Sequence, residues 1–367
     1  MSFGLPDLRL PISILMSIAL ASGSHRAEEA GRAGYLSPPE LIKLAEGSER
    51  TYMLRPIEEL GDLRVENFAE VFWPSMADSS EYPRISTDND GRRTLSEYDL
   101  EEDCRNLLME GESLFDSRQY DEARPIYERA AKMFPTCYVA HSHVGDCHYF
   151  QNDSAKALTW YRKALSLNPH DFRNHFYIGN ALFKLNRLQQ ARDAYVQALA
   201  LRPHRESVVK ALRARADKLG IHVVDQPFVP RALAREEDGQ IGVYVDGSSP
   251  YWLVYGLCKG VWIGEPEHRQ KRTGDTKHVW SLVEERQCLM SMLESYYAVR
   301  EDESVERDPE MERILESLKS EVLDGFVLYE IAYRLHGHAT LLLPREVFDD
   351  VVKYVDLQVL AEAGRPR

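Results

Sequence analysis

The chain has 367 residues, of which 44% are hydrophobic and 28% charged, with 21 Gly and 18 Pro. This ordinary globular composition excludes a collagen, a disordered chain and a multispan membrane protein. The 45 Lys and Arg residues against 59 Asp and Glu residues give a net charge of −14. An acidic chain repels phosphate backbones, and the only basic run is the short stretch 268–272, so we expect no nucleic-acid partner. The length predicts two or three domains.

The N-terminus carries a ten-residue apolar run, Ile12–Ala21, which is too short to cross a membrane as a helix. The run fits the core of a secretory signal, and Ala19–Ala21 has the small-x-small pattern that a signal peptidase reads. A short buried helix is the alternative. We therefore expect no stable membrane span. Residues 1–21 are expected to be the signal peptide of an exported protein (periplasmic or secreted); without that signal the protein would be cytoplasmic.

Residues 22–103 are mixed in composition and poorly periodic. Ser37 followed by Pro38 is typical of a helix start, because Ser caps helices and Pro suits the first helical turn. Scattered apolar residues predict a second helix around Val65–Val71. The stretch Ser75–Arg93 is rich in Ser, Asp, Pro, Asn and Gly, which predicts a linker or a long loop.

Residues 104–203 consist of tandem repeats. A shift of 34 residues aligns the chain with itself, without a gap, over three copies. Five columns are identical in all copies, and they hold Gly111, Gly145 and Gly179; Ala123, Ala157 and Ala191; Tyr127, Tyr161 and Tyr195; Ala130, Ala164 and Ala198; Pro135, Pro169 and Pro203. Identity at one fixed spacing indicates three copies of one structural unit.

Each copy contains two amphipathic stretches joined by a short polar turn, at 118–119, 152–153 and 186–187. Two helices joined so closely lie antiparallel. Small residues in the Gly and Ala columns allow the helices to approach, and Tyr supplies a large apolar body with a polar tip. Pro ends the second helix. One pair cannot bury its apolar face alone, so neighbouring pairs stack.

These columns resemble tetratricopeptide repeats, a family with a 34-residue period. The resemblance implies a mainly α fold, an α-solenoid with a right-handed superhelical stack of helix pairs over 104–220. Glu206–Leu219 is then the helix that closes the array. The family usually has an early Trp in each repeat, and Leu107, His141 and His175 stand in its place here.

The resemblance also implies a binding surface, because the first helix of each pair lines a concave groove in this family. The set of residues expected on this surface includes aromatic residues and residues of both charge signs. Its eleven members are Arg105, Leu108, Glu112, Phe115, Ser142, Asp146, Tyr149, Arg173, Phe176, Asn180 and Phe183. Such a surface suits an extended peptide or a partner helix. Alternatively, residues 22–103 fold back and bury these aromatics.

Some members of the family clamp the C-terminal carboxylate of a chaperone tail with Lys, Asn, Asn, Lys and Arg at set groove columns. Those columns hold Leu108, Glu112, His143, Arg173 and Tyr177 in this chain. Only Arg173 is compatible with the clamp, so we expect no chaperone-tail carboxylate clamp.

The chain changes character again after the repeats. Residues 221–239 are interpreted as a linker. The pattern also predicts two short strands, at 221–224 and at 241–245. Residues 240–367 are expected to form a second, mostly helical C-terminal domain of no recognised family. Its helices are predicted at 249–262, 279–300, 309–332 and 345–360.

No cysteine or histidine pattern indicates a metal or a cofactor. The five cysteines, Cys104, Cys137, Cys147, Cys258 and Cys288, contain no CxxC pair, and buried free thiols are the favoured interpretation. His143 and Cys147 share one helix face, but His141 and His148 occupy columns that pack inside the helix pair. A second group, Glu330, His336 and His338, is explained by a loop at Gly337.

Catalytic motifs are absent: the sequence has no GxSxG, P-loop, HExxH or paired-Gly dinucleotide turn. The sequence therefore predicts a non-catalytic adaptor that binds a peptide or partner protein in the groove of its repeats. The alternative is an enzyme or regulatory protein whose site lies in residues 240–367, where Asp246, His278, Glu284 and Cys288 could meet, with the repeats recruiting the partner.

Overall fold

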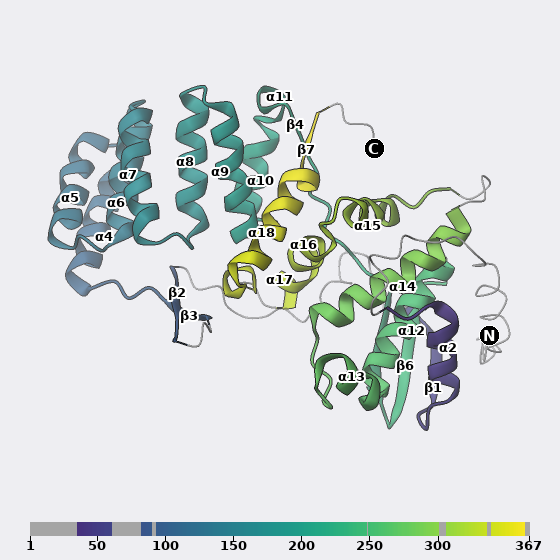
Figure 1. Ribbon diagram of the computed structural model, residues 1–367. Coiled ribbons are helices and arrows are strands. Elements are labelled where there is room, and N and C mark those ends of the chain that lie inside the picture. The colour runs from purple at the N-terminus through teal and green to yellow at the C-terminus, as the bar shows by residue number, and fades with distance from the viewer. Residues whose placement is uncertain are drawn as a thin grey trace, which may run out of the picture. The chain divides into compact units, whose positions relative to one another are not determined.

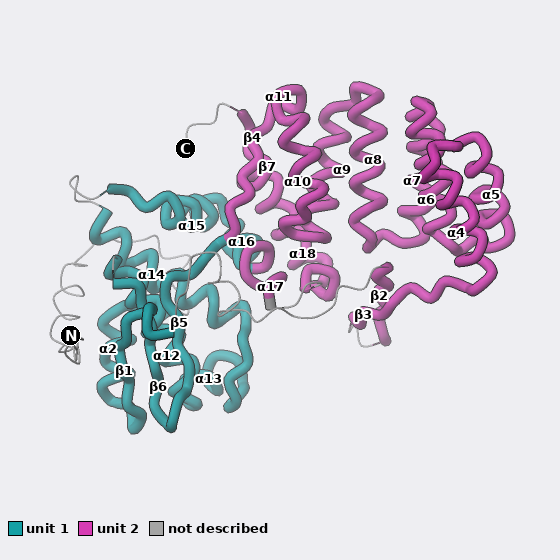
Figure 2. The backbone as a smooth tube through the Cα atoms, turned by 180° about the vertical axis from the view of Figure 1, so that it is seen from behind, with its two compact units in different colours: residues 1–75, 228–327 teal, residues 76–227, 328–367 magenta. Residues whose placement is uncertain are grey.

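A computed structural model describes residues 35–60, 82–89, 93–247, 249–300, 306–335 and 339–363 (Figure 1). The chain forms two compact units (Figure 2): residues 1–75 with 228–327, and residues 76–227 with 328–367. Helices predominate in both. Within the described residues, no helix is long and apolar enough to span a bilayer. The expected signal peptide at 1–21 and the expected helix at Val65–Val71 lie outside the described residues.

The repeats form the six helices that the sequence predicts. They are α4 (Glu102–Asp116), α5 (Tyr120–Met133), α6 (Tyr138–Phe150), α7 (Ser154–Leu167), α8 (Phe172–Lys184) and α9 (Leu188–Leu201). Consecutive helices run antiparallel and stand side by side (Figure 1). The expected closing helix is split into α10 (Glu206–Arg213) and α11 (Ala216–Leu219), which ends at Gly220 with a φ of 65°.

The Gly and Tyr columns are explained by direct contact within each repeat. A Cβ atom built on Gly111 would lie 2.4 Å from the ring of Tyr127. The equivalent distances are 2.6 Å from Gly145 to Tyr161 and 2.6 Å from Gly179 to Tyr195. Glycine is therefore required because a fully buried tyrosine ring lies flat against the first helix.

The turn inside each repeat uses one left-handed residue. Arg118, Asn152 and Asn186 have φ values of 61°, 64° and 59°, and they are spaced by the repeat length. Asparagine tolerates this conformation, whereas a long side chain such as Arg adopts it at a cost. The first repeat therefore carries a less favourable turn residue than the other two.

A β-hairpin occupies part of the stretch that the sequence predicts as a linker, Ser75–Arg93, so that prediction is wrong there. Strand β2 (Pro83–Thr87) pairs antiparallel with β3 (Arg93–Glu97). The Asn168 amide donates to the Pro83 carbonyl at 2.8 Å. Contacts with the repeats thus stabilise a hairpin whose strands alone carry few apolar residues.

The last part of the chain packs on the third repeat. It comprises η4 (Leu328–Ala332), α17 (Tyr333–Leu335), η5 (Ala339–Leu342), α18 (Arg345–Tyr354), η6 (Val355–Val359) and β7 (Leu360–Glu362). Strand β7 pairs antiparallel with β4 (Ile221–Val223). The Arg192 guanidinium of α9 contacts the Asp356 carboxylate and donates to the Leu360 carbonyl at 3.0 Å. The structure thus groups residues 328–367 with the repeats, whereas the sequence-based division places all of 240–367 in one domain.

The other unit is built on a three-stranded sheet in the order β1 (Tyr52–Pro56), β6 (Gln240–Val245) and β5 (Ala232–Glu237). Strand β1 is parallel to β6, and β5 is antiparallel to it. Helix α12 (Pro250–Gly264) lies against this sheet, and a Cβ on its Gly260 would be 3.1 Å from Val243. Strands β4 and β6 match the two that the sequence predicts, whereas β5 lies inside the expected linker 221–239 and was not predicted.

Further helices pack around α12 and α14 in this unit. They are α2 (Pro38–Glu46), α13 (Pro266–Thr273), α14 (Leu282–Arg300), α15 (Pro309–Lys319) and α16 (Leu323–Val327), and a 3-10 turn, η2 (Ile57–Leu60), follows β1. The predicted start of α2 is confirmed, since both the amide and the hydroxyl of Ser37 donate to the Glu40 carboxylate. The helix predicted over 309–332 is interrupted where Glu321 adopts a φ of 57°.

Candidate functional site

The candidate site is the face of the repeats formed by the eleven predicted residues on α4, α6 and α8, which we call the inner face. Two of its polar members hold the repeat tyrosines. The Tyr161 hydroxyl donates to the Asp146 carboxylate at 2.7 Å, and the Tyr195 hydroxyl donates to the Asn180 side chain at 2.9 Å. These acceptors are thus partly occupied by the protein itself, which sequence spacing could not show.

The first repeat breaks this pattern. Its corresponding acceptor, Glu112, is exposed, and the buried Tyr127 hydroxyl has no hydrogen-bond partner among the described residues. The imidazole of His143 stacks on the Tyr127 ring at 4.9 Å. His143 also approaches the Asp146 carboxylate at 3.4 Å. The inner face therefore keeps an uncommitted carboxylate on α4 but not on α6.

Ser142 and Arg173 are also bonded internally. The Ser142 hydroxyl donates to Asn174 at 2.7 Å. The Arg173 guanidinium forms a short ion pair with Asp171 and lies 4.5 Å from the ring centre of Tyr82, beside the hairpin. Arg173 is therefore a poor candidate for a free cation in a binding site.

Phe115, the first aromatic residue of the inner face, packs against two neighbouring rings and remains partly exposed. Phe115 lies 5.1 Å from Tyr120 and 5.4 Å from Phe150, ring centre to ring centre. Phe150 itself stacks on Tyr120 at 5.4 Å and keeps 51% of its surface exposed. Phe150 was not among the predicted site residues, although it adjoins Tyr149 in the sequence.

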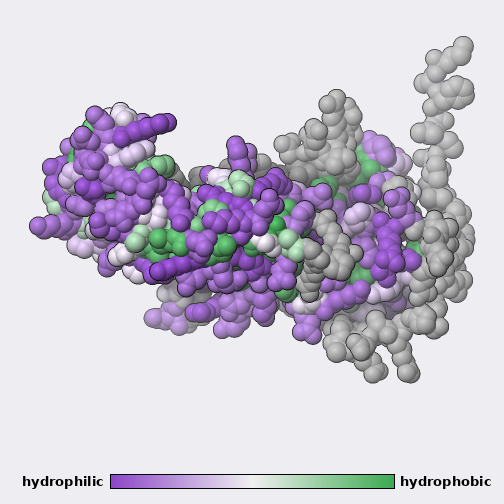
Figure 3. All heavy atoms as spheres, turned by 90° about the horizontal axis from the view of Figure 1, so that it is seen from above, coloured by the Kyte–Doolittle hydropathy of each residue, from purple (hydrophilic) through white to green (hydrophobic). Residues whose placement is uncertain are grey.

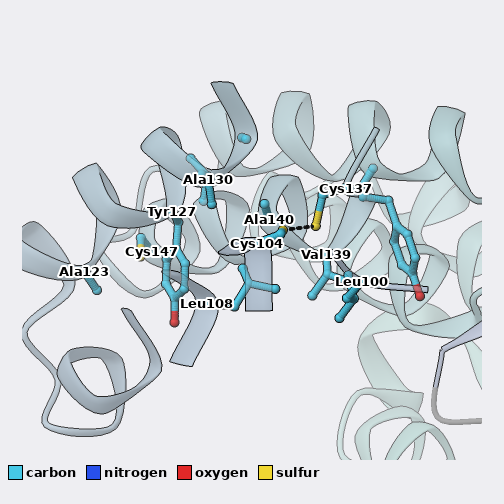
Figure 4. Packing of buried hydrophobic residues seen from close by; sticks show 14 residues of the cluster. Leu100, Cys104, Leu108, Ala123, Tyr127, Ala130, Cys137, Val139, Ala140 and Cys147 are labelled. Carbon is cyan, nitrogen blue, oxygen red and sulfur yellow. Dashed lines mark hydrogen bonds between the residues drawn. The ribbon is translucent and has the colours of Figure 1, made fainter. Parts of the chain in front are cut away.

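Three further predicted members are buried or already engaged in contacts within the protein. Leu108 is buried in the core of the first repeats (Figure 4). Phe176 is partly buried and packs against Tyr195 at 6.1 Å. Arg105 is exposed, and its guanidinium donates to the Leu100 carbonyl at 3.4 Å.

A group of rings and cations lies where α6 and α8 end and α11 begins. The Lys184 ammonium is 3.8 Å from the ring centre of Tyr149. The Arg215 guanidinium and the Lys218 ammonium lie 5.3 Å and 4.9 Å from the ring centre of Phe183. We call these five residues the aromatic–cation cluster. Partial burial lowers the pKa of Lys184 and raises the pKa of Tyr149, which Arg215 partly offsets.

The second candidate site was the group Asp246, His278, Glu284 and Cys288. His278 Nε2 lies 3.0 Å from Glu284, and Cys288 follows one turn later on α14, next to Cys258. Asp246 lies in the turn after β6, with its amide bonded to the Arg231 carbonyl.

The structure adds Lys259 to this second group, 2.6 Å from Glu284 and 2.8 Å from Glu285. Burial opposes ionisation of both partners, but their mutual attraction outweighs it: the pKa of Lys259 is raised well above its usual range and the pKa of Glu284 is lowered. Glu285 also accepts hydrogen bonds from Tyr255 and Trp280. Such a closed set of partners fixes a core rather than exposing a reactive group.

The candidate metal ligands are dispersed. His141 Nε2 contacts the Pro135 carbonyl at 3.0 Å, and one repeat later His175 Nε2 contacts the Pro169 carbonyl at 3.3 Å. Both residues replace the usual Trp, and burial lowers the pKa of each imidazole. Over the described ranges, no three His, Cys, Asp or Glu side chains gather as a metal site would require. His336 and His338 lie outside those ranges.

Two family models described as tetratricopeptide repeat match residues 108–172 and 172–205. Residues 108–205 are tetratricopeptide repeats. This assignment agrees with the six stacked helices and with the Gly–Tyr contacts in each copy. Among curated proteins, none is similar enough to the chain to count as a relative.

Several solved structures are similar to about a third of this chain. One is the first repeat domain of Spaghetti (RPAP3) bound to the HSP90 peptide SRMEEVD, at 24% identity and a TM-score of 0.31, with 32% of this chain and 92% of that chain covered. Another is PcrH in complex with the chaperone-binding region of PopD, at 19% identity and a TM-score of 0.30, with 33% of this chain and 93% of that chain covered. A third is the Yersinia enterocolitica chaperone SycD in complex with a peptide of YopD, at 15% identity and a TM-score of 0.30, with 33% of this chain and 91% of that chain covered.

Proposed function

We propose that this protein is a non-catalytic adaptor whose tetratricopeptide repeats hold a peptide or a segment of a partner protein on the inner face. The observation that carries the proposal is the exposed aromatic cluster at the start of the array. Phe150 is half exposed, yet its position is fixed by ring contacts with Phe115 and Tyr120. Rigid aromatic side chains that remain in water are typical anchors of protein interfaces.

Further aromatic residues of the inner face support the same role. Figure 3 shows that one side of the molecule is mainly hydrophilic, with apolar patches within it. Tyr149 and Phe183 continue the aromatic series toward α11. Aromatic anchors separated by polar groups favour an extended segment, since such a segment presents side chains at several points along the array.

Truncation of Phe150 in the full chain tests the proposal. Peptides selected from a random display library on the unmodified protein serve as ligands, with fluorescence anisotropy as the measurement. Phe150→Ala is expected to weaken their binding by about 2 kcal/mol or more while leaving the helical circular dichroism unchanged. Met133→Ala is the matched control, because Met133 is 58% exposed but lies on the second helix of its pair.

Two outcomes would overturn the proposal. In one, the full chain retains no peptide from the library above the background of an uncoated support. In the other, peptides are retained but Phe150→Ala and Met133→Ala bind them equally well. Phe176→Ala provides a comparison for stability. Because Phe176 packs on the buried Tyr195, this variant is expected to lower the melting temperature, whereas Phe150→Ala is expected to affect binding alone.

A further inference from the structure

Charge is distributed unevenly along the repeats. Residues 102–133, which include α4 and α5, contain five Lys and Arg against eight Asp and Glu. Residues 172–219, which include α8 to α11, contain ten Lys and Arg against three Asp and Glu. The whole chain has a net charge of −14, so this basic segment runs against the overall composition. The array therefore has an acidic end and a basic end.

Part of the basic charge is neutralised within the same unit. Arg192 pairs with Asp356, and Arg213 lies 3.5 Å from Asp225. Arg173 pairs with Asp171. These cations serve the packing of the array and of the C-terminal segment against it.

Three cations of the aromatic–cation cluster are different. In the part of the chain that the structure describes, no carboxylate oxygen comes within 4.0 Å of Lys184, Arg215 or Lys218. Lys184 donates to the Tyr149 carbonyl and to the Asn152 side chain, and Arg215 donates to the Ala211 carbonyl. All of these acceptors are neutral. The cluster thus combines positive charge with two aromatic rings and lacks an anion.

The opposite end of the inner face shows the reverse. Glu112 and Asp116 on α4 are exposed, and within the described residues neither forms an ion pair. Burial is the largest cause that raises the pKa of the Tyr127 hydroxyl. The negative charges of Glu112 and Asp116, together with Cys147 and Asp146, raise this pKa further. Both carboxylates belong to α4, the first helix of the first repeat.

From this we infer that the partner segment is an acidic peptide whose carboxylates meet Lys184, Arg215 and Lys218, and whose part lying over α4 carries no negative charge. The inference rests on the proposed function and adds the chemistry and the direction of the ligand. Carboxylates of the peptide would form ion pairs with the three cations, which have no carboxylate partner among the described residues. Tyr149 and Phe183 would pack against apolar side chains of the same peptide. An acidic segment lying in the reverse direction would place its carboxylates beside Glu112 and Asp116.

The experiment uses the full chain and a library of random twelve-residue peptides displayed on phage. Sequencing of the retained pool is expected to show Asp and Glu enriched at one end of the peptides. One retained peptide is then made with a fluorescent label and titrated by anisotropy. The triple variant Lys184→Glu/Arg215→Glu/Lys218→Glu is expected to weaken its binding about ten- to a hundredfold, and added NaCl to reduce that difference.

A matched control carries the same charge change on the second helices: Lys132→Glu/Arg162→Glu/Lys163→Glu on α5 and α7. It is expected to change affinity by no more than about twofold, as rim or remote charges do. The milder Lys184→Gln/Lys218→Gln variant guards against misfolding of the triple variant. It is expected to weaken binding in the same direction while keeping the circular dichroism of the unmodified protein.

The outcomes separate this inference from the proposed function. A retained pool that depends on Phe150 but shows no acidic enrichment overturns the inference and leaves the adaptor function standing. Failure to retain any peptide overturns both. If a labelled twelve-residue oligothymidine binds and competes with the peptide, the three cations serve a nucleic acid and the inference is wrong. If the matched control weakens binding as much as the triple variant, the effect is one of total charge and the inference also fails.

Discussion

His204 Nε2 lies 3.1 Å from Glu330 Oε2, although the two residues are 126 positions apart in the sequence. On the other side of the same imidazole, Nδ1 lies 2.8 Å from Asp225. Tyr354 donates to the second Glu330 oxygen at 2.9 Å. The rings of Tyr329 and Tyr333 lie 4.8 Å and 5.1 Å from the imidazole, centre to centre, in tilted arrangements. One histidine at the end of the repeats thus connects them to the C-terminal segment of the same unit.

This arrangement predicts a loss of stability at alkaline pH. Burial lowers the pKa of His204, but Glu330 and Asp225 outweigh it and raise the pKa from 6.5 to about 9. A raised folded-state pKa gives stability that is complete below pH 6.5 and lost as pH rises through 9. We expect a loss of about 3 kcal/mol, measured by urea unfolding at pH 6 and at pH 10.

The control for the pH experiment is His204→Gln, which should be less stable at pH 6 and should show a flatter pH dependence. His222→Gln, at an exposed position on β4, should follow the unmodified protein. An unmodified protein equally stable at both pH values would contradict the prediction.

The Gly–Tyr contact predicts a severe packing defect at Gly145. A leucine there would drive its Cβ to 2.6 Å from the Tyr161 ring, which is fully buried and cannot move away. Gly145→Leu is expected to cost about 1–3 kcal/mol or more, seen as a lower melting temperature. Gly247→Ala is the control, since nothing lies within 4 Å of the added carbon. Equal melting temperatures for the two variants would disagree with this packing.

The turn column predicts a stabilising substitution in the first repeat. Arg118 adopts a φ of 61°, which glycine tolerates without the clash that a side chain brings. Relief of the left-handed strain, about 1–2 kcal/mol, exceeds the chain-entropy cost of glycine, about 0.5–1 kcal/mol. Arg118→Gly is therefore expected to raise the melting temperature, by an amount corresponding to about 0.5–1 kcal/mol. Arg162→Gly, at an exposed position inside α7, should lower it by about 1 kcal/mol. A decrease in both variants would argue against a strained turn.

The buried charges around Lys259 predict strong non-additivity. Lys259→Met leaves Glu284 and Glu285 without their cation in a buried site, at an expected cost of about 3–5 kcal/mol. The triple variant Lys259→Met/Glu284→Gln/Glu285→Gln removes all three charges and should recover most of that loss. Chemical denaturation of the three proteins checks this, and a triple variant no more stable than Lys259→Met would refute it.

We propose that residues 1–21 are removed during export, so that the mature protein begins near Ser22. Cys104 Sγ and Cys137 Sγ lie 2.7 Å apart in the first repeats (Figure 4). In an oxidising compartment this pair is expected to form a disulfide. Mass spectrometry of protein from the source organism tests both points, and an intact Met1 with five free thiols would exclude them.

The repeats could be predicted because their determinants are local. Gly145, its partner Tyr161 and the turn at Asn152 all lie within one repeat, and the copies reinforce the pattern. The pairing of Tyr52 with Ile241 gives no such signal, because both strands are short and lie far apart in the chain. The same holds for the packing of η5, α18 and η6 on α9.

At the inner face, residue positions could be predicted but their partners could not. Asp146 and Asn180 lie on the helices where the spacing places them, yet each accepts a hydrogen bond from a tyrosine of its own repeat. The aromatic–cation cluster depends on the position of Arg215 at the start of α11. This position is set by the break that divides the predicted helix into α10 and α11. Helical periodicity alone does not determine such a break.

Because β1 pairs with β6, the ribosome must make residues 57–239 before synthesis of the partner strand of β1 begins. At about 5–20 residues per second, β1 waits roughly ten to forty seconds, and all three repeats emerge in that time. An unpaired strand is open to wrong pairing with other chains during this interval. Nascent chains halted before Gln240 should therefore carry folded repeats together with a protease-sensitive, chaperone-bound N-terminal segment.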